Sequence, residues 1–380
     1  MVHQYINNGY HIVLDVNSGA IHVVDEVVYD VISLFEKHSS EEITGLLREK
    51  YSEEEIREAV EEVAQLKEEG SLFTPDTYEA PLIDFKKRPT VVKALCLHIA
   101  HDCNLACRYC FAEEGEYHGR RALMSYETGK AALDFLIANS GSRRNLEVDF
   151  FGGEPLMNFE VVKQLVAYGR EQEKLHDKHF RFTLTTNGVL LNDDIMEFAN
   201  REMDNVVLSI DGRKEVHDHM RPFRKGAGSY DLIVPKFQKF AKSRNQEKYY
   251  VRGTYTHFNT DFSKDVLHLA DLGFKQISVE PVVAEETDDY AIKEEDLPVL
   301  FKEYDDLAAE MVRRNKAGNG FNFFHFMIDL EGGPCVYKRL SGCGSGTEYL
   351  AVTPWGDLYP CHQFVGEEAF KLGDIYTGVT

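Results

Sequence analysis

The chain has 380 residues, of which 43% are hydrophobic and 28% are charged, a composition typical of a globular protein with two or three domains. Its formal net charge of −22 argues against a nucleic-acid partner, because binding to a phosphate backbone needs clustered Lys and Arg. No apolar run reaches the roughly eighteen residues of a membrane span, and Met1-Val2-His3-Gln4 lacks the pattern of a signal peptide. We therefore expect a cytoplasmic protein that binds neither nucleic acid nor membranes.

Residues 1–75 are expected to form a small domain. Segments 10–16 and 20–24 have the composition of two short strands joined by a turn. Three helices should follow, and the second and third open at Ser39 and Ser52, each with a Glu three residues later, as in a capping box. A hairpin followed by three helices is a winged-helix-like pattern. Its commonest function is DNA binding, but these helices are rich in Glu.

A linker is expected over residues 76–92, and a repeating pattern begins after it. Strands are predicted at 94–99, 146–151, 180–186, 205–210, 249–257 and 276–282, with helices near 125–140, 158–173, 192–202, 229–243 and 262–272. This alternation favours an α/β fold of parallel βαβ units, either an open doubly wound sheet or a full or partial (β/α) barrel. In both folds, functional residues gather at the carboxyl ends of the strands.

Three of the seven cysteines, Cys103, Cys107 and Cys110, lie in the loop after the first of these strands. Thiolates at positions i, i+4 and i+7 can hold three corners of a cubane iron–sulfur cluster and leave the fourth iron open to a substrate or cofactor. Zinc is one alternative, but structural zinc sites are four-coordinate and no second cysteine pair lies nearby. A purely structural cysteine group is another. Cys96, on the strand itself, is expected to be a buried core thiol.

The C-x3-C-x2-C spacing, with an aromatic residue before the last cysteine, resembles the signature of radical S-adenosylmethionine (SAM) enzymes. The resemblance extends over residues 94–285, because Gly152-Gly153-Glu154-Pro155 matches the second motif of that family. It implies a partial (β/α)6 TIM-like barrel, here over residues 93–320. It also implies a [4Fe–4S] cluster whose open iron is chelated by the amino and carboxylate groups of SAM. Reductive cleavage of SAM would then yield a 5′-deoxyadenosyl radical that takes a hydrogen atom from the substrate.

The resemblance suggests roles for the residues around this loop. Tyr109 offers an aromatic face and a backbone near the adenine, while Gly152 and Gly153 permit a close approach of the backbone. Glu154 can accept the ammonium group of the methionine moiety. Ser209 can donate to the ribose or to the carboxylate of SAM.

Two arginines are candidates for the carboxylate of SAM, with Arg221 favoured over Arg252. Asn187 is a further candidate for cofactor binding, although a left-handed turn beside Gly188 would explain it equally well. Asp211 can be explained as the cap of a helix.

Residues 321–380 contain three more cysteines in a Gly-rich segment, with a hairpin predicted at 348–359. The segment resembles the SPASM extension of radical SAM enzymes that modify peptides. That resemblance implies at least one auxiliary [4Fe–4S] cluster, with Cys335, Cys343 and Cys361 as ligands. The later cysteine run of the family is absent, so a second auxiliary cluster is not expected to be complete, and the extension is expected to be cut short.

One departure from the family pattern affects a possible catalytic residue. Some relatives have an Asp that acts as a base directly after the third cysteine of the extension. Here that position is occupied by His362, so a catalytic role for this residue is left open.

In this setting, residues 1–75 resemble the leader-peptide recognition domain of enzymes that modify ribosomally made peptides. Such domains bind an extended leader by adding a strand to the edge of their hairpin. The domain order resembles that of maturases of SCIFF peptides, short cysteine-rich precursors in which thioether crosslinks form from Cys to Thr. The resemblance implies a Cys-containing precursor peptide as substrate and a low-potential reductant, such as flavodoxin or ferredoxin, as a second partner.

Three alternatives stay open from the sequence. A peptide maturase with another outcome, such as a carbon–carbon crosslink or formylglycine, shares every motif, although the N-terminal domain weighs against the sulfatase type. A non-catalytic iron–sulfur protein that binds peptides or transfers electrons would leave Gly152-Gly153-Glu154 without a role. A DNA-binding redox regulator fits the winged-helix pattern and is opposed by the charge.

Overall fold

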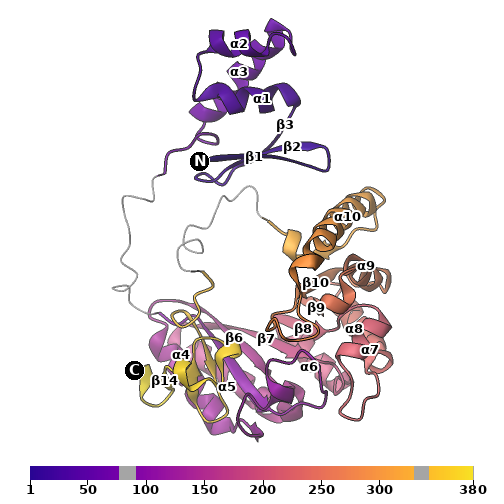
Figure 1. The fold of residues 1–380 in the computed structure, drawn as a ribbon. Helices are drawn as coiled ribbons and strands as arrows, with labels where there is room; N and C mark the ends of the chain where they lie inside the picture. Colours follow the sequence, from indigo (N-terminus) through magenta and orange to yellow (C-terminus); the bar gives the residue numbers. More distant parts are fainter. Residues whose placement is uncertain (77–90, 329–341, 380) are drawn as a thin grey trace. The chain divides into compact units, whose positions relative to one another are not determined.

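A computed structural model of the chain describes residues 1–76, 91–328 and 342–379. Of these, the first of two compact units contains residues 1–76 with Ile328 and Gly342, and the second contains the rest (Figure 1). None of the described helices combines the length and apolar composition that a bilayer span requires.

The first unit begins with a three-stranded antiparallel sheet. Its strands pair in chain order: β1 (Val2–Asn7), β2 (Tyr10–Asp15) and β3 (Ile21–Val24). The predicted pair of strands at 10–16 and 20–24 is therefore confirmed. Strand β1 was not predicted, because none of its residues is buried and its sequence shows no apolar face. The order leaves β1 and β3 as the two edges of the sheet.

Three helices complete this unit: α1 (Glu26–Phe35), α2 (Ser40–Leu47) and α3 (Glu53–Glu68). Both predicted capping boxes are present, because Ser39 exchanges hydrogen bonds with Glu42, and Ser52 with Glu55. The helices pack on β2 around a small core of their own. It consists of Val13, Val28, Val31, Ile32, Ile43, Ile56, Ala59, Val63 and Leu72.

The second unit is built on a sheet of six parallel strands. They are β4 (Ala94–His101), β6 (Asn145–Gly152), β7 (His179–Thr186), β8 (Asn205–Ser209), β9 (Tyr249–Tyr255) and β10 (Gln276–Pro281). Each strand pairs with the next in chain order. A doubly wound sheet would place later strands on both sides of the first. The sequential order is that of a partial (β/α)6 barrel, and all six predicted strands are confirmed.

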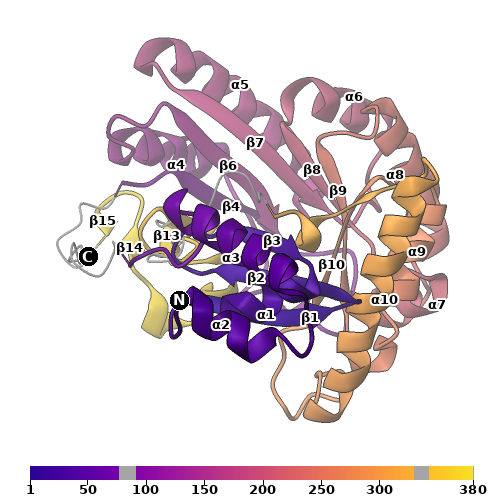
Figure 2. The ribbon, with the colours of Figure 1, turned by 90° about the horizontal axis from the view of Figure 1, so that it is seen from above.

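Helices lie along the outer side of these strands (Figure 2). They are α4 (Tyr126–Asn139), α5 (Phe159–His176), α6 (Asp193–Glu202), α8 (Tyr230–Ser243), α9 (Ser263–Asp271) and α10 (Leu297–Lys316). The first five were predicted. Helix α10, whose only buried residues are Leu300 and Leu307, and the short helix α7 (Lys214–Met220) were not predicted.

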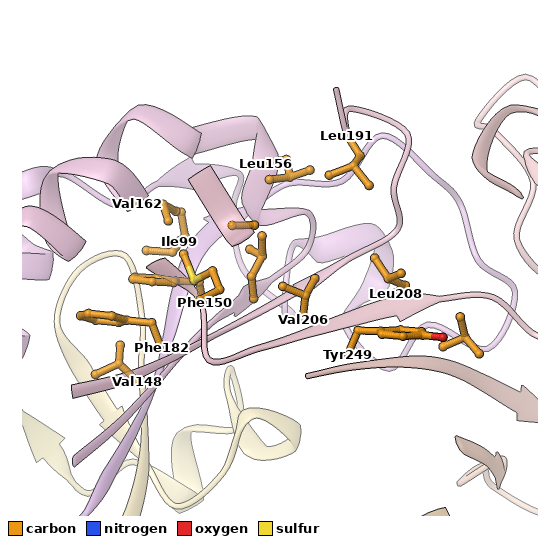
Figure 3. Packing of buried hydrophobic residues seen from close by; sticks show 14 of the residues in the cluster. Ile99, Val148, Phe150, Leu156, Val162, Phe182, Leu191, Val206, Leu208 and Tyr249 are labelled. Carbon is orange, nitrogen blue, oxygen red and sulfur yellow. The ribbon is translucent and has the colours of Figure 1, made fainter. Parts of the chain in front are cut away.

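The main core fills the space between the strands and these helices. On β4, Leu95, Leu97 and Ile99 face this core, while the alternate residues Cys96 and His98 face the other way. Large aromatic side chains add to it, and Figure 3 shows three of them, Phe150, Phe182 and Tyr249. Each side chain buried in this way stabilises the fold by about 1.5–3 kcal/mol.

The C-terminal extension continues the barrel sheet beyond β4. Strand β12 (Tyr349–Val352) pairs in parallel with β4 and antiparallel with β13 (Asp357–Tyr359), so the predicted hairpin at 348–359 is confirmed. Four short strands complete the sheet: β5 (Ala122–Leu123) beside β4, β11 (Asn322–Phe323) beside β10, β14 (Gly373–Asp374) and β15 (Gly378–Val379). The extension therefore folds together with the barrel.

Candidate functional site

A cavity of about 450 Å³ opens at the carboxyl ends of the parallel strands. This volume lies within the range of roughly 300–1,000 Å³ that is common for small-molecule sites. Most of the residues predicted to bind a cluster or cofactor line it: Cys103, Cys107, Tyr109, Cys110, Gly152, Gly153, Asn187, Ser209, Arg221 and Arg252. The predicted strand-end residues are thus brought together in one place.

The cysteine loop is fixed by the segment that follows α7. The amide of Ala106 donates to the carbonyl of Pro222 at 2.9 Å, and the Arg224 guanidinium donates to the Cys103 carbonyl at 2.7 Å. Burial raises the pKa of both Cys103 and Cys107 to about 12. Both thiols therefore have to lose a proton when they bind a metal.

The arrangement of these thiols distinguishes a cluster from a single metal ion. Ligands of one ion converge on one point, whereas the thiolates of a cubane cluster bind three different irons. Within the described residues, no three His, Cys, Asp or Glu side chains converge in a way that would hold a single ion. Three thiols on the wall of one cavity fit the ligand set of a cluster with an open iron.

The Gly-Gly turn after β6 packs directly against the backbone that leads into the cysteine loop. The φ angle of Gly152 is +119°, and a Cβ on this residue would lie 2.4 Å from the carbonyl oxygen of Ala100. A Cβ on Gly153 would lie 2.1 Å from the carbonyl oxygen of Asp102. Both positions need glycine for close contact with the protein's own backbone, so the turn fixes the position of the loop.

The carboxylate of Glu154, expected to accept the ammonium group of SAM, lies outside the cavity lining. Glu154 is fully buried and is not among the residues that line the cavity. Its oxygens accept hydrogen bonds from the Thr186 hydroxyl (2.8 Å) and from the amides of Asn187 (2.8 Å) and Leu156 (3.0 Å). Burial raises its pKa to about 7, against the opposing effect of these three donors. Glu154 holds the ends of β6 and β7 together, and the Gly-Gly backbone faces the cavity.

Arg221 is anchored by a buried carboxylate. Asp211 accepts from the Nε of Arg221 at 2.9 Å, from the hydroxyl of Tyr109 at 2.8 Å and from the amide of Thr254 at 3.1 Å. The expectation that Asp211 caps a helix is wrong, because α7 has no side-chain cap. The Arg221 guanidinium also lies over the Tyr109 ring, 5.3 Å from its centroid. Asp211, which was not predicted as a site residue, thus holds the predicted cofactor residues Tyr109 and Arg221 in place.

Asn187 makes its contacts through its side chain. The Nδ2 atom donates to the Oδ1 of Asn104 at 2.7 Å and lies 3.6 Å from the Sγ of Cys103. The left-handed residue in this turn is Gly188, with φ of +78°, so a left-handed conformation does not explain Asn187. The side chain links the end of β7 to the cysteine loop.

Several residues in the walls of the cavity were not predicted from the sequence. Glu280, at the end of β10, forms an ion pair with Arg252. The position of Glu280 at the end of a predicted strand is the sequence feature that could have identified it. Phe364 enters from the C-terminal extension, and Phe111 and Phe151 add aromatic surface. No pattern in the sequence connects Phe364 to this cavity, because only the pairing of β12 with β4 brings the extension there.

The predicted auxiliary ligands are only partly described. Cys335 lies outside the described residues. Cys343 is exposed, while burial and the nearby Cys343 thiol raise the pKa of Cys361. His362 does not line the cavity. Its Nδ1 lies 3.3 Å from the Tyr349 hydroxyl, and burial lowers its pKa to about 4.

Comparisons with known proteins agree with this geometry. Residues 97–272 match the family model described as Radical SAM superfamily. An uncharacterized protein, MJ0907 from Methanocaldococcus jannaschii, is 31% identical over 189 residues, which cover 49% of this chain and 62% of that protein. A cysteine-type anaerobic sulfatase-maturating enzyme from Clostridium perfringens is 25% identical over 291 residues, 72% of this chain and 74% of the enzyme. The chain spans less than two thirds of the length of several curated relatives that it matches, between 38% and 64% for three of them.

Two solved structures share the fold. The protein anSMEcpe with bound AdoMet has a TM-score of 0.62 at 20% identity, covering 76% of this chain and 79% of its own. Streptococcus suis SuiB bound to precursor peptide SuiA has a TM-score of 0.56 at 16% identity, covering 100% of this chain and 85% of its own. The three-cysteine loop and the Gly-Gly turn both lie within residues 97–272, the stretch that matches the Radical SAM superfamily model.

Proposed function

We propose that this protein is a radical SAM maturase that modifies a ribosomally made peptide. The observation that carries the proposal is the placement of Cys103, Cys107 and Cys110 beside the Gly-Gly turn, on the wall of one cavity inside the radical SAM domain. A non-catalytic iron–sulfur protein needs neither that turn nor the cavity. A DNA-binding regulator is opposed by the first unit, in which acidic side chains outnumber basic ones.

Different residues of the cavity are proposed to hold the cluster and the separate parts of SAM. When bound, a cluster with an open iron supplies the electron that cleaves SAM into a carbon radical able to remove a hydrogen atom. The three cysteines hold the cluster, and the backbone of Gly152 and Gly153 offers polar groups to the methionine end of SAM. Arg221 uses its Nε for Asp211 and lines the cavity, so its guanidinium is placed for a carboxylate. Ser209 and Thr254 add hydroxyls for a ribose.

The first unit is proposed to bind the leader of the peptide. Strand β3 pairs only with β2 within the described residues, so its outer edge can accept an added strand. Val23, on this edge strand, is 64% exposed and gives an incoming strand an apolar contact. SuiB, whose fold matches over the whole of this chain, was solved with its precursor peptide. We extend that partner class to this protein as part of the proposal.

The chemical outcome that we propose is a thioether crosslink between a cysteine sulfur and an α-carbon of the same peptide. The α-hydrogen would leave with the 5′-deoxyadenosyl radical and the thiol would lose its proton. The one electron left when the C–S bond forms would pass to an auxiliary cluster. Cys335, Cys343 and Cys361 are three candidate thiolates for an auxiliary cluster, and a cysteine of the substrate is proposed as the ligand of its fourth iron. Binding to iron would hold that thiol deprotonated beside the cavity. A low-potential reductant of the flavodoxin or ferredoxin type would supply electrons.

Formylglycine formation is the second candidate. It is favoured by the similarity to a cysteine-type anaerobic sulfatase-maturating enzyme over 72% of the chain. The first unit argues against it, because a sulfatase substrate needs no leader. The two outcomes differ in mass, so mass spectrometry of a modified peptide separates them.

Deleting residues 1–75 tests the role of the first unit. That unit and the barrel have separate cores, so the shortened protein should still fold and cleave SAM slowly without substrate. Modification of a precursor that carries its leader should be lost. Equal modification by the full-length and shortened proteins would contradict the proposed role in recognition.

A spectroscopic experiment tests the thioether proposal. In a variant with Cys103, Cys107 and Cys110 changed to Ala, only the auxiliary cluster should remain. A precursor peptide with its cysteines should change the spectrum of that cluster, and the same peptide with Ser in place of Cys should not. Identical spectra, with binding of both peptides shown independently, would rule out ligation by the substrate thiol.

A further inference from the structure

The side-chain amide of Asn187 is held in one orientation beside the cysteine loop. Its Oδ1 accepts a hydrogen bond from the backbone amide of Val189 at 3.0 Å. The backbone amide of Asn187 donates to the buried carboxylate of Glu154 at 2.8 Å, and the residue is only 7% exposed. The oxygen of the side-chain amide therefore faces the following turn, and the Nδ2 group, which can only donate, faces away from it.

The Nδ2 group of Asn187 carries two hydrogens and faces two acceptors. One acceptor is the Oδ1 of Asn104, which lies 2.7 Å from Nδ2. The other is the Sγ of Cys103, which lies 3.6 Å from Nδ2. Sulfur is a larger atom than oxygen, so hydrogen bonds to it are longer. Asn187 therefore directs a donor at the sulfur of a residue that is proposed to bind the iron–sulfur cluster.

A second amide at this place lacks an acceptor. The Nδ2 of Asn104 is buried and has no hydrogen-bond partner among the described residues. Exchanging the two ends of this amide would not help, because its Oδ1 accepts from Asn187 and a donor would then face a donor. Buried donors in folded proteins are nearly always satisfied. The loop around Cys103 is therefore suited to a bound group that brings its own acceptors, as the sulfur atoms of a cluster do.

We propose that Asn187 donates a hydrogen bond to the Cys103 sulfur of the bound cluster and raises the reduction potential of that cluster. Reduction adds negative charge, so a donor directed at a sulfur stabilises the reduced cluster more than the oxidised cluster. The inference rests on the proposed function, because it concerns the same cluster, and it assigns Asn187 to that cluster instead of to SAM. Asn187 acts through Cys103 and is a positioning residue.

The test compares reduction potentials in the full-length protein reconstituted with iron and sulfide. A redox titration is followed by electron paramagnetic resonance. The signal of this cluster is the one that is absent from the variant with Cys103, Cys107 and Cys110 changed to Ala. Asn187→Leu keeps the size of the side chain and removes the donor, so we expect reduction to become about tenfold less favourable. For a one-electron couple, this is a fall in midpoint potential of about 59 mV.

A second variant and a matched control separate the donor from the turn that holds it. In Asn187→Thr the hydroxyl can still accept from the Val189 amide, but the side chain is too short to reach Cys103, so the potential should fall by a similar amount. Asn192 is the control, because its Oδ1 also accepts from a backbone amide, that of Ile195 at 3.0 Å, and it does not line the cavity. Asn192→Leu should leave the potential unchanged.

Two results would overturn the inference alone. The first is a single midpoint potential shared by the wild type and both Asn187 variants. The second is an equal fall in Asn192→Leu, which would assign the effect to a general change in the loop. A wild type that forms no cluster on Cys103, Cys107 and Cys110 would overturn the inference and the proposed function together. A cluster that shows the expected shift but does not cleave SAM would contradict the proposed function and leave the inference supported.

Discussion

Two arginine–carboxylate pairs line or support the same cavity, and they differ chiefly in exposure. The side chains of Arg221 and Asp211 are 13% and 0% exposed, and Asp211 has two further donors in Tyr109 and Thr254. The side chains of Arg252 and Glu280 are 45% and 32% exposed.

The difference in exposure predicts a difference in function. A buried pair costs a great deal to break, because one charge is then left without a partner, whereas an exposed pair contributes little to stability. Asp211 therefore serves as a fixed support for the SAM side of the cavity. The Arg252–Glu280 pair contributes little to folding and remains available to a ligand. Burial raises the pKa of Glu280, but the hydrogen bonds and charge of Arg252, together with smaller effects of His325 and Ser278, lower this pKa below its ordinary value.

The largest effect is expected from Asp211→Asn. The amide cannot neutralise Arg221, and its NH2 group faces donors, so the free energy of unfolding should fall by about 3–5 kcal/mol. Denaturant titration of the reconstituted protein measures this change. A loss below about 1 kcal/mol would show that the buried pair is no more important for folding than the exposed one.

An intermediate effect is expected from Asp15→Asn in the first unit. Asp15 is fully buried without an arginine, and it accepts from the amides of Asn17, Ser18 and Thr74. The substitution should destabilise this unit by about 1–3 kcal/mol, because buried amides lose an ionised acceptor. Hydrogen exchange of the amides in β2 measures the loss of protection, and unchanged exchange would contradict it. This variant separates the effect of burial from the effect of a cationic partner.

Asp15 should also make the stability of the first unit depend on pH. Burial raises the pKa of this carboxyl group, but the three amides outweigh that effect and lower it below its ordinary value of 3.8. Its contribution is therefore present above pH 3.8 and is lost as the pH falls through the lower, folded-state value. The wild type should show this acid-induced loss and Asp15→Asn should not. The same acid sensitivity in both proteins would assign it to other groups.

The smallest effect on stability is expected from Glu280→Gln. An exposed pair is worth about 0–1 kcal/mol, so the midpoint of denaturant unfolding should hardly move. With an unchanged midpoint, any loss of ligand binding by Glu280→Gln would reflect a lost contact and not a loss of folding. A loss comparable to that of Asp211→Asn would mean that Arg252 and Glu280 are a structural pair, and the contrast between the two sides of the cavity would disappear.

The sequence was most informative where the signal is local. The cysteine loop and the Gly-Gly turn are short motifs, and the capping boxes at Ser39 and Ser52 depend on residues three apart. Six strands were evident from the alternation of strands and helices. Strand β1 was missed because it buries too little to create a pattern.

Contacts between strands were beyond the reach of sequence reasoning. Arg252 and Glu280 are 28 residues apart and meet because of the register of β9 and β10. Glu154 was predicted from its motif, but its carboxylate accepts from Thr186 and from the Asn187 amide at the end of the neighbouring strand. Composition and spacing identify a polar residue at a strand end. They do not say which of its neighbours it contacts.

The most direct test of the proposed function is the formation of 5′-deoxyadenosine after anaerobic reconstitution with iron, sulfide, SAM and a low-potential reductant. We expect the wild type to form it and the variant with Cys103, Cys107 and Cys110 changed to Ala to form none, while that variant keeps iron at its remaining cysteines. Equal formation of 5′-deoxyadenosine by the two proteins, or none by a wild type shown to contain its cluster and to bind SAM, would contradict the assignment of this cavity as a radical SAM site.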